Sequence, residues 1–209
     1  MKNLSFTHQM KILGPSWRSK PLHYQQIIVD ADLCNKLGDS NTYPYLCILL
    51  PLISDKIFIH QIVYDEILQS KSTKEQIERL ITDRCMFIVD ELSLSPSEMQ
   101  VYTATYCLLE SRMMDPRFPR KNRGEVSSLA YAKTKSIPIF ATDEKNLQTI
   151  IDSVLNAGMQ KITCLRIEDI VKQIKEGQFC TLGRKDAKLI WAISGKKTEV
   201  FNSVIWPLG

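Results

Sequence analysis

Four acidic side chains follow short apolar segments of the sequence, and their type and spacing suit the binding of metal ions. Asp30 ends the segment QIIVD, and Asp143 ends the segment IPIFATD. Glu66 lies on the helix that we predict directly after the segment KIFIH, and Glu125 opens a helix that follows a basic loop. Grouped carboxylates repel one another and raise one another's pKa unless a cation lies among them. The hard ions Mg²⁺ and Mn²⁺ prefer oxygen ligands of this kind, so we expect these acids to form a divalent-metal site.

The segments that carry these acids are predicted strands of a parallel sheet. Five apolar runs, QIIVDAD, KIFIH, CMFIVD, IPIFATD and KITCL, are typical of strands buried on both faces. Helices are predicted between and after them, over 43–52, 61–70, 72–82, 96–112, 124–135, 144–153 and 167–176. This alternation indicates an α/β fold around a mainly parallel sheet with helices on both faces. Ligands of such sheets bind beyond the carboxyl ends of the strands, so the acids are predicted to converge there.

Acidic residues near helix starts also act as caps and as partners of the helix dipole. That explanation covers any one of these acids, but four at corresponding strand ends are harder to attribute to capping. Asp30 and Asp143 are the strongest candidates because each directly follows an apolar strand. Neighbouring carboxylates that could support the site, or serve only as caps, are Asp32, Asp65 and Glu144.

The loop before Glu125 is strongly basic. Within seven residues it carries four cations, which are Arg117, Arg120, Lys121 and Arg123. Such clusters attract phosphate backbones without sequence preference, although a basic loop is also an ordinary solvated surface. Further candidates for phosphate contact on the following helix are Ser128 and Lys133. Two aromatic side chains could stack on an unpaired base or pack in the core, namely Phe118 and Tyr131.

The segments IIVDADLCNKL, HQIVYDEIL and RGEVSSLAYAKTKSIPIFATDEKNL, taken in this order, resemble the PIN-domain nucleases. The resemblance covers roughly residues 27–170, and its most specific part runs from Gly124 to Leu147. It maps the acidic set of that family onto the four acids Asp30, Glu66, Glu125 and Asp143. The family often has Thr-Asn or Thr-Ser after the leading Asp, where this chain has Ala31 and Asp32.

This resemblance implies a three-layer α/β/α sandwich and the metal-dependent hydrolysis of a phosphodiester, most often in RNA. Two divalent ions roughly 3.5–4 Å apart can activate water and stabilise both the attacking and the leaving oxygen. We expect Asp30, Glu125 and Asp143 to hold two Mg²⁺ or Mn²⁺ ions, and Glu66 to ligate directly or through water. The expected activity is that of an endoribonuclease on single-stranded or structured RNA, with DNA left open as a substrate.

Compact bacterial proteins that resemble this family are often toxins held by an antitoxin, commonly as dimers. The resemblance therefore also implies a toxin of a toxin–antitoxin pair, with an antitoxin or other protein partner and a homodimer as expected assemblies.

Two other functions remain open from the sequence. A phosphatase of the haloacid dehalogenase type would use Asp30 as nucleophile and Asp32 as acid and base, because IIVDAD resembles its D-x-D motif. Against this, Cys34 stands where that family usually has Thr or Val, and no second predicted strand ends in Thr or Ser. The other alternative is a non-catalytic PIN-like module that binds RNA or a protein partner and keeps the acids only as helix caps.

Length and composition limit the remaining possibilities. The chain has 209 residues, enough for one sizeable core with modest extensions. We expect an irregular arm over 1–26, the PIN-like domain over 27–176, and an extension over 177–209 that packs on the domain or on a partner. In the extension we expect a helix and then a strand. The net charge of +4, from 27 basic and 23 acidic residues, does not by itself distinguish a nucleic-acid-binding protein.

The composition excludes fibrous, disordered and membrane-embedded classes. The most apolar stretch, 45–53, is interrupted by Pro51 and is far shorter than the roughly 20 residues that span a membrane. The first ten residues contain no apolar run of a secretory signal. The 6 cysteines lie far apart without a CxxC pair, which favours reduced thiols over disulfides or a zinc site. We expect a cytoplasmic protein without a membrane partner.

Overall fold

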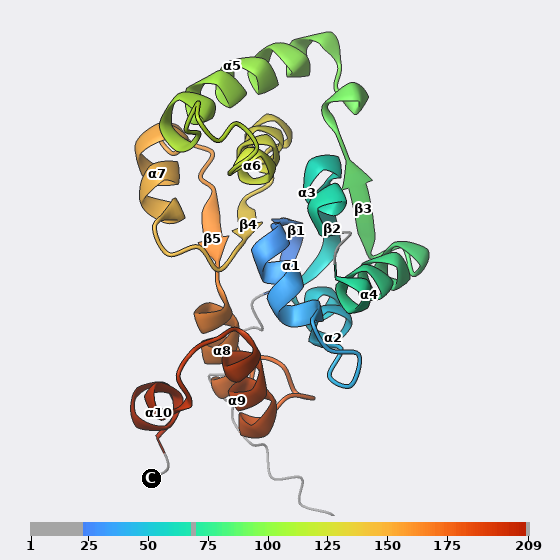
Figure 1. Ribbon diagram of the computed structural model, residues 1–209, viewed down its shortest axis with the longest axis vertical. Coiled ribbons are helices and arrows are strands. Elements are labelled where there is room, and N and C mark those ends of the chain that lie inside the picture. Colours follow the sequence, from blue (N-terminus) through green and yellow to red (C-terminus); the bar gives the residue numbers. More distant parts are fainter. Residues whose placement is uncertain (1–22, 68–69, 208–209) are drawn as a thin grey trace, which may run out of the picture.

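The computed structural model of the chain describes residues 23–67 and 70–207 (Figure 1). The predicted arm over 1–26 therefore lies mostly outside the described residues. Its last three residues, 24–26, belong to the first strand instead, because that strand begins earlier than its apolar part.

Five strands form a single sheet in which all neighbouring strands are parallel. They are β1 (Tyr24–Val29), β2 (Ser54–His60), β3 (Met86–Val89), β4 (Ile139–Ala141) and β5 (Thr163–Leu165). Their order is β3-β2-β1-β4-β5, so β1 lies at the centre. Val29 pairs with Ile59 of β2 and with Ala141 of β4, which aligns the carboxyl ends of these three strands. The predicted α/β fold with a parallel sheet is confirmed.

Helices connect the strands and follow the last one. They are α1 (Ala31–Gly38), α2 (Tyr45–Ile53), α3 (Gln61–Glu66), α4 (Lys71–Thr82), α5 (Pro96–Met113), α6 (Arg123–Lys135), α7 (Leu147–Val154), α8 (Ile167–Lys175), α9 (Arg184–Ile193) and α10 (Thr198–Val200). A 3-10 turn spans Glu91–Ser93, and a turn of π-helix spans Phe201–Ile205. No helix among 23–67 and 70–207 is long and apolar enough to cross a membrane.

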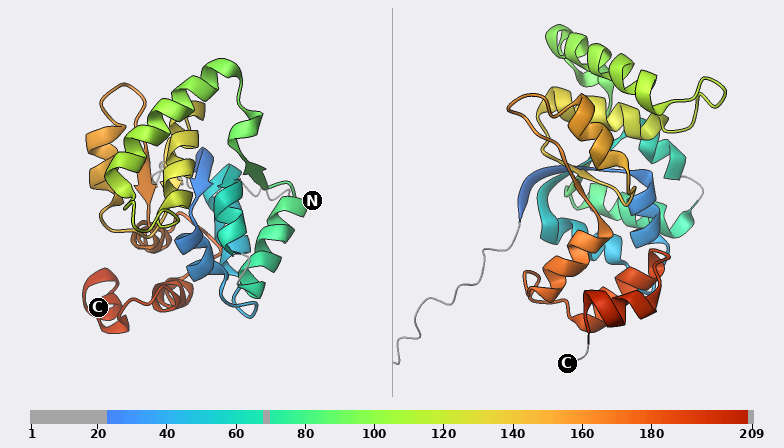
Figure 2. Two further views of the ribbon diagram at one scale, coloured as in Figure 1. Left: turned by 45° about the horizontal axis from the view of Figure 1, so that its top comes forward. Right: turned by 90° about the vertical axis from the view of Figure 1, so that its left-hand side faces the viewer.

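Alternate residues of β1 enter two different cores. Ile27 and Val29 pack with side chains from α1, α2, α4, α8 and α9, whereas Ile28 packs with side chains from α5, α6 and α7. The right-hand view of Figure 2 shows the strands between these two sets of helices. Because both faces of the centre of the sheet are covered, β4 and the carboxyl half of β1 are continuously apolar rather than alternating in polarity.

The segment after α8 packs against the main core. Ala187, Ile190 and Trp191 of α9, together with Phe201, are buried in the same cluster as Leu33 of α1. The strand that we predicted in this segment does not form. Its residues make α10 and the π-turn, because the backbone N–H of Trp206 donates to the carbonyl of Phe201 and so closes the turn that buries Phe201.

Candidate active site

Asp30 lies at the centre of the carboxyl edge of the sheet, directly after β1. Its exposed fraction is only 1%. One carboxylate oxygen accepts the backbone N–H of Ala31 at 2.7 Å and so caps α1, a helix that we had not predicted. The other oxygen accepts the hydroxyl of Thr142 at 3.0 Å. Thr142 directly follows β4, so this hydrogen bond joins the ends of two neighbouring strands and fixes the carboxylate between them.

The buried position of Asp30 makes its charge costly. Burial, together with the charges of Glu125 and Asp32, raises the pKa of Asp30 to about 7. The hydrogen bonds from Thr142 and Ala31 offset only part of this effect. Asp30 therefore titrates close to neutral pH, and a cation bound nearby would favour its ionised form.

Glu125 lies close enough to Asp30 on one side and to Glu66 on the other to interact electrostatically with both. Burial raises the pKa of Glu125, its own backbone N–H lowers it in part, and the charges of Glu144 and Asp32 raise it further. Burial also raises the pKa of Glu66, together with the charge of Glu125. The described residues form no ion pair with Asp30, Glu66 or Glu125, and only the charge of Arg123 acts against the rise in the pKa of Glu66.

The approach of α3 to α6 depends on a glycine. A Cβ atom at Gly124 would lie 2.9 Å from Oε2 of Glu66 and 3.0 Å from Cγ2 of Val63. Contacts this short require one of the partners to move. The absence of a side chain at Gly124 thus allows the carboxylate of Glu66 to lie against the first turn of α6, where Glu125 also begins.

Asp143 has a different environment from the other three acids. Its side chain is 4% exposed and accepts hydrogen bonds from Lys36 at 3.0 Å and from Lys196. Burial alone would raise the pKa of Asp143, but the hydrogen bonds from Lys196 and Lys36 outweigh it and hold the pKa below its usual value. Lys36 also donates to Asp32 at 2.8 Å. Asp143 is therefore an ion-paired carboxylate.

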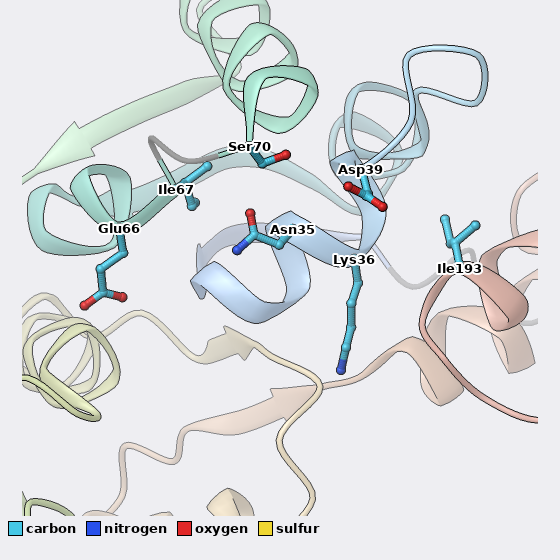
Figure 3. A pocket seen from close by; sticks show the side chains of 7 residues that line it. All are labelled: Asn35, Lys36, Asp39, Glu66, Ile67, Ser70 and Ile193. Atoms are coloured by element: carbon cyan, nitrogen blue, oxygen red, sulfur yellow. The ribbon is translucent and has the colours of Figure 1, made fainter.

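Two pockets flank the carboxylates. One, of about 420 Å³, is lined by Glu66 of α3, by Asn35 and Lys36 of α1, and by Ile193 of α9, among others. Figure 3 shows Lys36 extending from α1 toward the end of β4, and Glu66 extending toward α6. The second pocket, of about 150 Å³, is lined by Glu125 and neighbours that include Glu144 and Asn122. Open space thus reaches two of the acids from different sides.

Two of the four acids, Asp30 and Glu125, are suited to bind a divalent ion. In the part of the chain that the structure describes, no three His, Cys, Asp or Glu side chains are placed to hold a metal ion together. Mg²⁺ commonly needs only one or two carboxylates, because it retains several waters. Asp30 and Glu125 meet that demand, since their charges interact with each other and neither has an ion-pair partner among the described residues. Asp143 does not meet it, because two ammonium groups already balance its charge.

The carboxylates predicted to support the site are placed differently from one another. Asp32 binds Lys36, and Glu144 is exposed, with its backbone N–H donating to Thr142 at 3.2 Å. Asp65 is exposed and accepts a hydrogen bond from Gln61 of its own helix. The charges of Asp32 and Glu144 act on the site, because both raise the pKa of Glu125.

The basic loop stays exposed beside α6. Arg117 pairs with Asp115 at 2.6 Å and lies 5.9 Å from the ring of Phe118, which is 60% exposed. Among the described residues no carboxylate forms an ion pair with the other three cations, Arg120, Lys121 and Arg123. Arg123 begins α6, and its charge lowers the pKa of Glu66. It also lines a pocket of about 210 Å³ with Tyr102 and Tyr106 of α5. Arg123 therefore brings one cation of this cluster close to the acids.

Ser128 and Lys133, the two predicted contacts to nucleic acid on α6, are engaged within the protein, and so is Tyr131. Ser128 is fully buried and Tyr131 is 5% exposed, because the packing of α6 against the sheet and α5 covers nearly all of its first turns. Lys133 donates to the carbonyls of Leu155 and Gln160, near the end of α6 that leads into β4. Ser128 and Lys133 therefore have structural roles in place of the predicted contacts, and Tyr131 takes the packing role that the sequence left open.

The residues that sequence reasoning missed are Lys36, Lys196, Asn35 and Thr142. Only Lys36 had a local signal, since it lies four residues after Asp32, but that signal requires a helix that we had not predicted. No protein-family model matches the chain, and no curated protein or solved structure was found to be similar to it. What the site does must therefore be inferred from its own geometry and from the sequence.

Proposed function

We propose that the protein is a divalent-metal-dependent nuclease with a PIN-like fold, which hydrolyses phosphodiester bonds at the carboxyl edge of its sheet. The observation that carries this proposal is the buried carboxylate of Asp30, which interacts with Glu125 and has no ion-pair partner among the described residues, while Glu66 in turn interacts with Glu125. A protein that buries a carboxylate next to other carboxylates loses stability unless a cation joins them. The resemblance of the sequence to the PIN-domain nucleases gives independent support.

Each side chain has a separate task in this proposal. Asp30 and Glu125 would hold the ion, and Glu66, which is exposed, would contact it through water. A bound Mg²⁺ or Mn²⁺ would lower the pKa of a water molecule and offset charge on the phosphate. Thr142 holds the carboxylate of Asp30 in place, and Gly124 lets Glu66 approach.

The proposed substrate is RNA, single-stranded or structured. The basic loop supports a nucleic acid in general, because Arg120 and Lys121 are exposed and form no described ion pair. Cations of this kind attract a phosphate backbone without reading its sequence. The preference for RNA over DNA, and the toxin role with its antitoxin partner and dimer, remain predictions of the family resemblance.

The proposal is tested by incubating the protein with labelled RNA and DNA, single-stranded and duplex, in Mg²⁺, in Mn²⁺ and in EDTA. We expect cleavage only with a divalent ion. Asp30→Asn should reduce the rate by at least about 100-fold, since even the outer partners of a metal site contribute 10- to 100-fold. A matched control is Asp83→Asn, because Asp83 is exposed and ends α4 at the opposite edge of the sheet.

Other outcomes would support the alternatives. Tight RNA binding without cleavage in either ion would favour the non-catalytic module. Release of phosphate from small phosphomonoesters, with nucleic acid left intact, would favour the phosphatase. Cleavage by Asp30→Asn at the wild-type rate would refute the proposed site.

A further inference from the structure

Lys196 contacts Asp143 from a hydrogen-bonded turn that directly follows α9. α9 ends at Ile193, and Gly195 follows with φ of +76°, a left-handed conformation that favours glycine. The N–H of Gly195 donates to the carbonyl of Ala192 at 3.0 Å, and the N–H of Lys196 donates to that of Trp191 at 3.4 Å. The direction in which Lys196 leaves the helix is therefore fixed by the backbone.

The core holds this turn in place. Trp191 is 3% exposed, and its indole N–H donates to the carbonyl of Lys197 at 2.9 Å. The ammonium group of Lys196 lies 5.7 Å from the ring of the same tryptophan. The side chain of Lys196 is only 15% exposed. Lys196 is thus a largely buried cation whose position is fixed by packing against the core, whereas the side chain of the neighbouring Lys197 is exposed.

The charges around Asp143 are already balanced. Asp143 accepts from Lys36 and Lys196, and Lys36 also binds Asp32, so two carboxylates meet two ammonium groups. A divalent ion at Asp143 would have to displace these lysines, or would meet them as like charges. Asp30 and Glu125 have no such partners.

We infer that Lys36 and Lys196 supply at Asp143 the positive charge that a second metal ion would supply, so that the site binds one divalent ion, on Asp30 and Glu125. This inference rests on the proposed function and makes Lys196 a positioning residue from the C-terminal segment. It also changes the expectation of two ions that the sequence suggested. The C-terminal segment then completes the site of the central domain.

The stoichiometry of Mn²⁺ tests the inference without measuring cleavage. Mn²⁺ is titrated into the full chain by calorimetry, and the free ion is counted by electron paramagnetic resonance. We expect one ion per chain in the wild type and none in Asp30→Asn. Asp143→Asn should retain one ion, with binding weakened by much less than the factor of about 10 or more that loss of a direct ligand would cause.

Removal of the lysines should have the opposite effect. In Lys36→Met with Lys196→Met, Asp143 is released, and a second ion should bind. Lys197→Met is the matched control, because it removes the same charge from an exposed neighbour and should keep one ion. Should the double variant not fold, Asp143→Asn decides the question alone.

The failures can be told apart. Two ions in the wild type, or binding weakened by about 10-fold or more in Asp143→Asn, would overturn the inference and leave the proposed function standing. No bound ion in the wild type would overturn the proposed function itself.

Discussion

The titration of Asp30 should make the stability of the protein depend on pH in a way that one substitution removes. Burial raises the pKa of Asp30 from 3.8 to about 7. The folded protein therefore keeps this proton up to about pH 7, while the unfolded chain releases it near pH 4. Where only the folded state holds the proton, the free energy of unfolding falls as pH rises. The contribution of Asp30 to the free energy of unfolding is thus largest below about pH 4, and it is lost as the pH rises from about 4 to above 7.

The size of the effect follows from the two pKa values. Each pKa unit corresponds to 1.36 kcal/mol, so the rise of Asp30 corresponds to about 4 kcal/mol. Asp30→Asn carries no charge at any pH. Its amide can still accept the N–H of Ala31 and can donate to the hydroxyl of Thr142. The unfolding free energy of Asp30→Asn, relative to the wild type, should therefore increase by about 4 kcal/mol between pH 4 and pH 8.

The measurement is urea unfolding of both proteins in EDTA at several pH values, followed by tryptophan fluorescence and circular dichroism. The difference between the two curves removes the groups that titrate alike in both. Addition of Mn²⁺ at about 100 times its dissociation constant should then stabilise the wild type at pH 8 by about 2.7 kcal/mol, with no effect on the variant. Parallel pH dependences for the two proteins would refute the proposed burial and charge of Asp30.

Three further changes have expected outcomes. Lys196→Met leaves the buried carboxylate of Asp143 with one ammonium partner and should lower the unfolding free energy by about 2 kcal/mol at pH 7; an effect no larger than that of Lys197→Met would contradict the described ion pair. Gly124→Ala places a Cβ atom 2.9 Å from the neighbouring glutamate carboxylate and should slow cleavage more than it lowers the melting temperature; an unchanged rate would show that this contact is unimportant. Reversal of Arg120 and Lys121 to Glu should weaken RNA binding and reduce the slope of log affinity against log salt by about 2, since each phosphate contact contributes about 1; an unchanged slope would remove the loop from the RNA surface.

The sheet could be predicted because strands buried on both faces have a distinctive composition. Ile27, Ile28 and Val29 are all fully buried, so the apolar run has no alternation that could be mistaken for a surface strand. The edge at which Asp30 and Asp143 meet then follows from the parallel direction of the strands. α1 was missed because its eight residues follow Asp30 at once, and the aspartate that ends the strand is also the helix cap.

The ion pairs of the site could not be predicted in the same way. Asp143 meets Lys36 across 107 positions and Lys196 across 53, so no local spacing links them. The fate of Ser128 depends on tertiary packing as well, because burial runs without interruption over 126–132 of α6, and no single apolar face marks the buried side. Sequence patterns report the elements and the edges where they end, whereas these partners are decided by how the elements pack.

The central claim is that Asp30 and its neighbouring glutamates hold a divalent ion that hydrolyses nucleic acid. The most direct measurement is the rate of RNA cleavage during a Mn²⁺ titration, compared in the same buffer with the binding curve of Mn²⁺, for the wild type and Asp30→Asn. We predict that the wild-type rate rises in proportion to the occupied fraction of one Mn²⁺ site, and that the variant shows neither binding nor cleavage. Cleavage that persists in EDTA, or in Asp30→Asn, would contradict the claim.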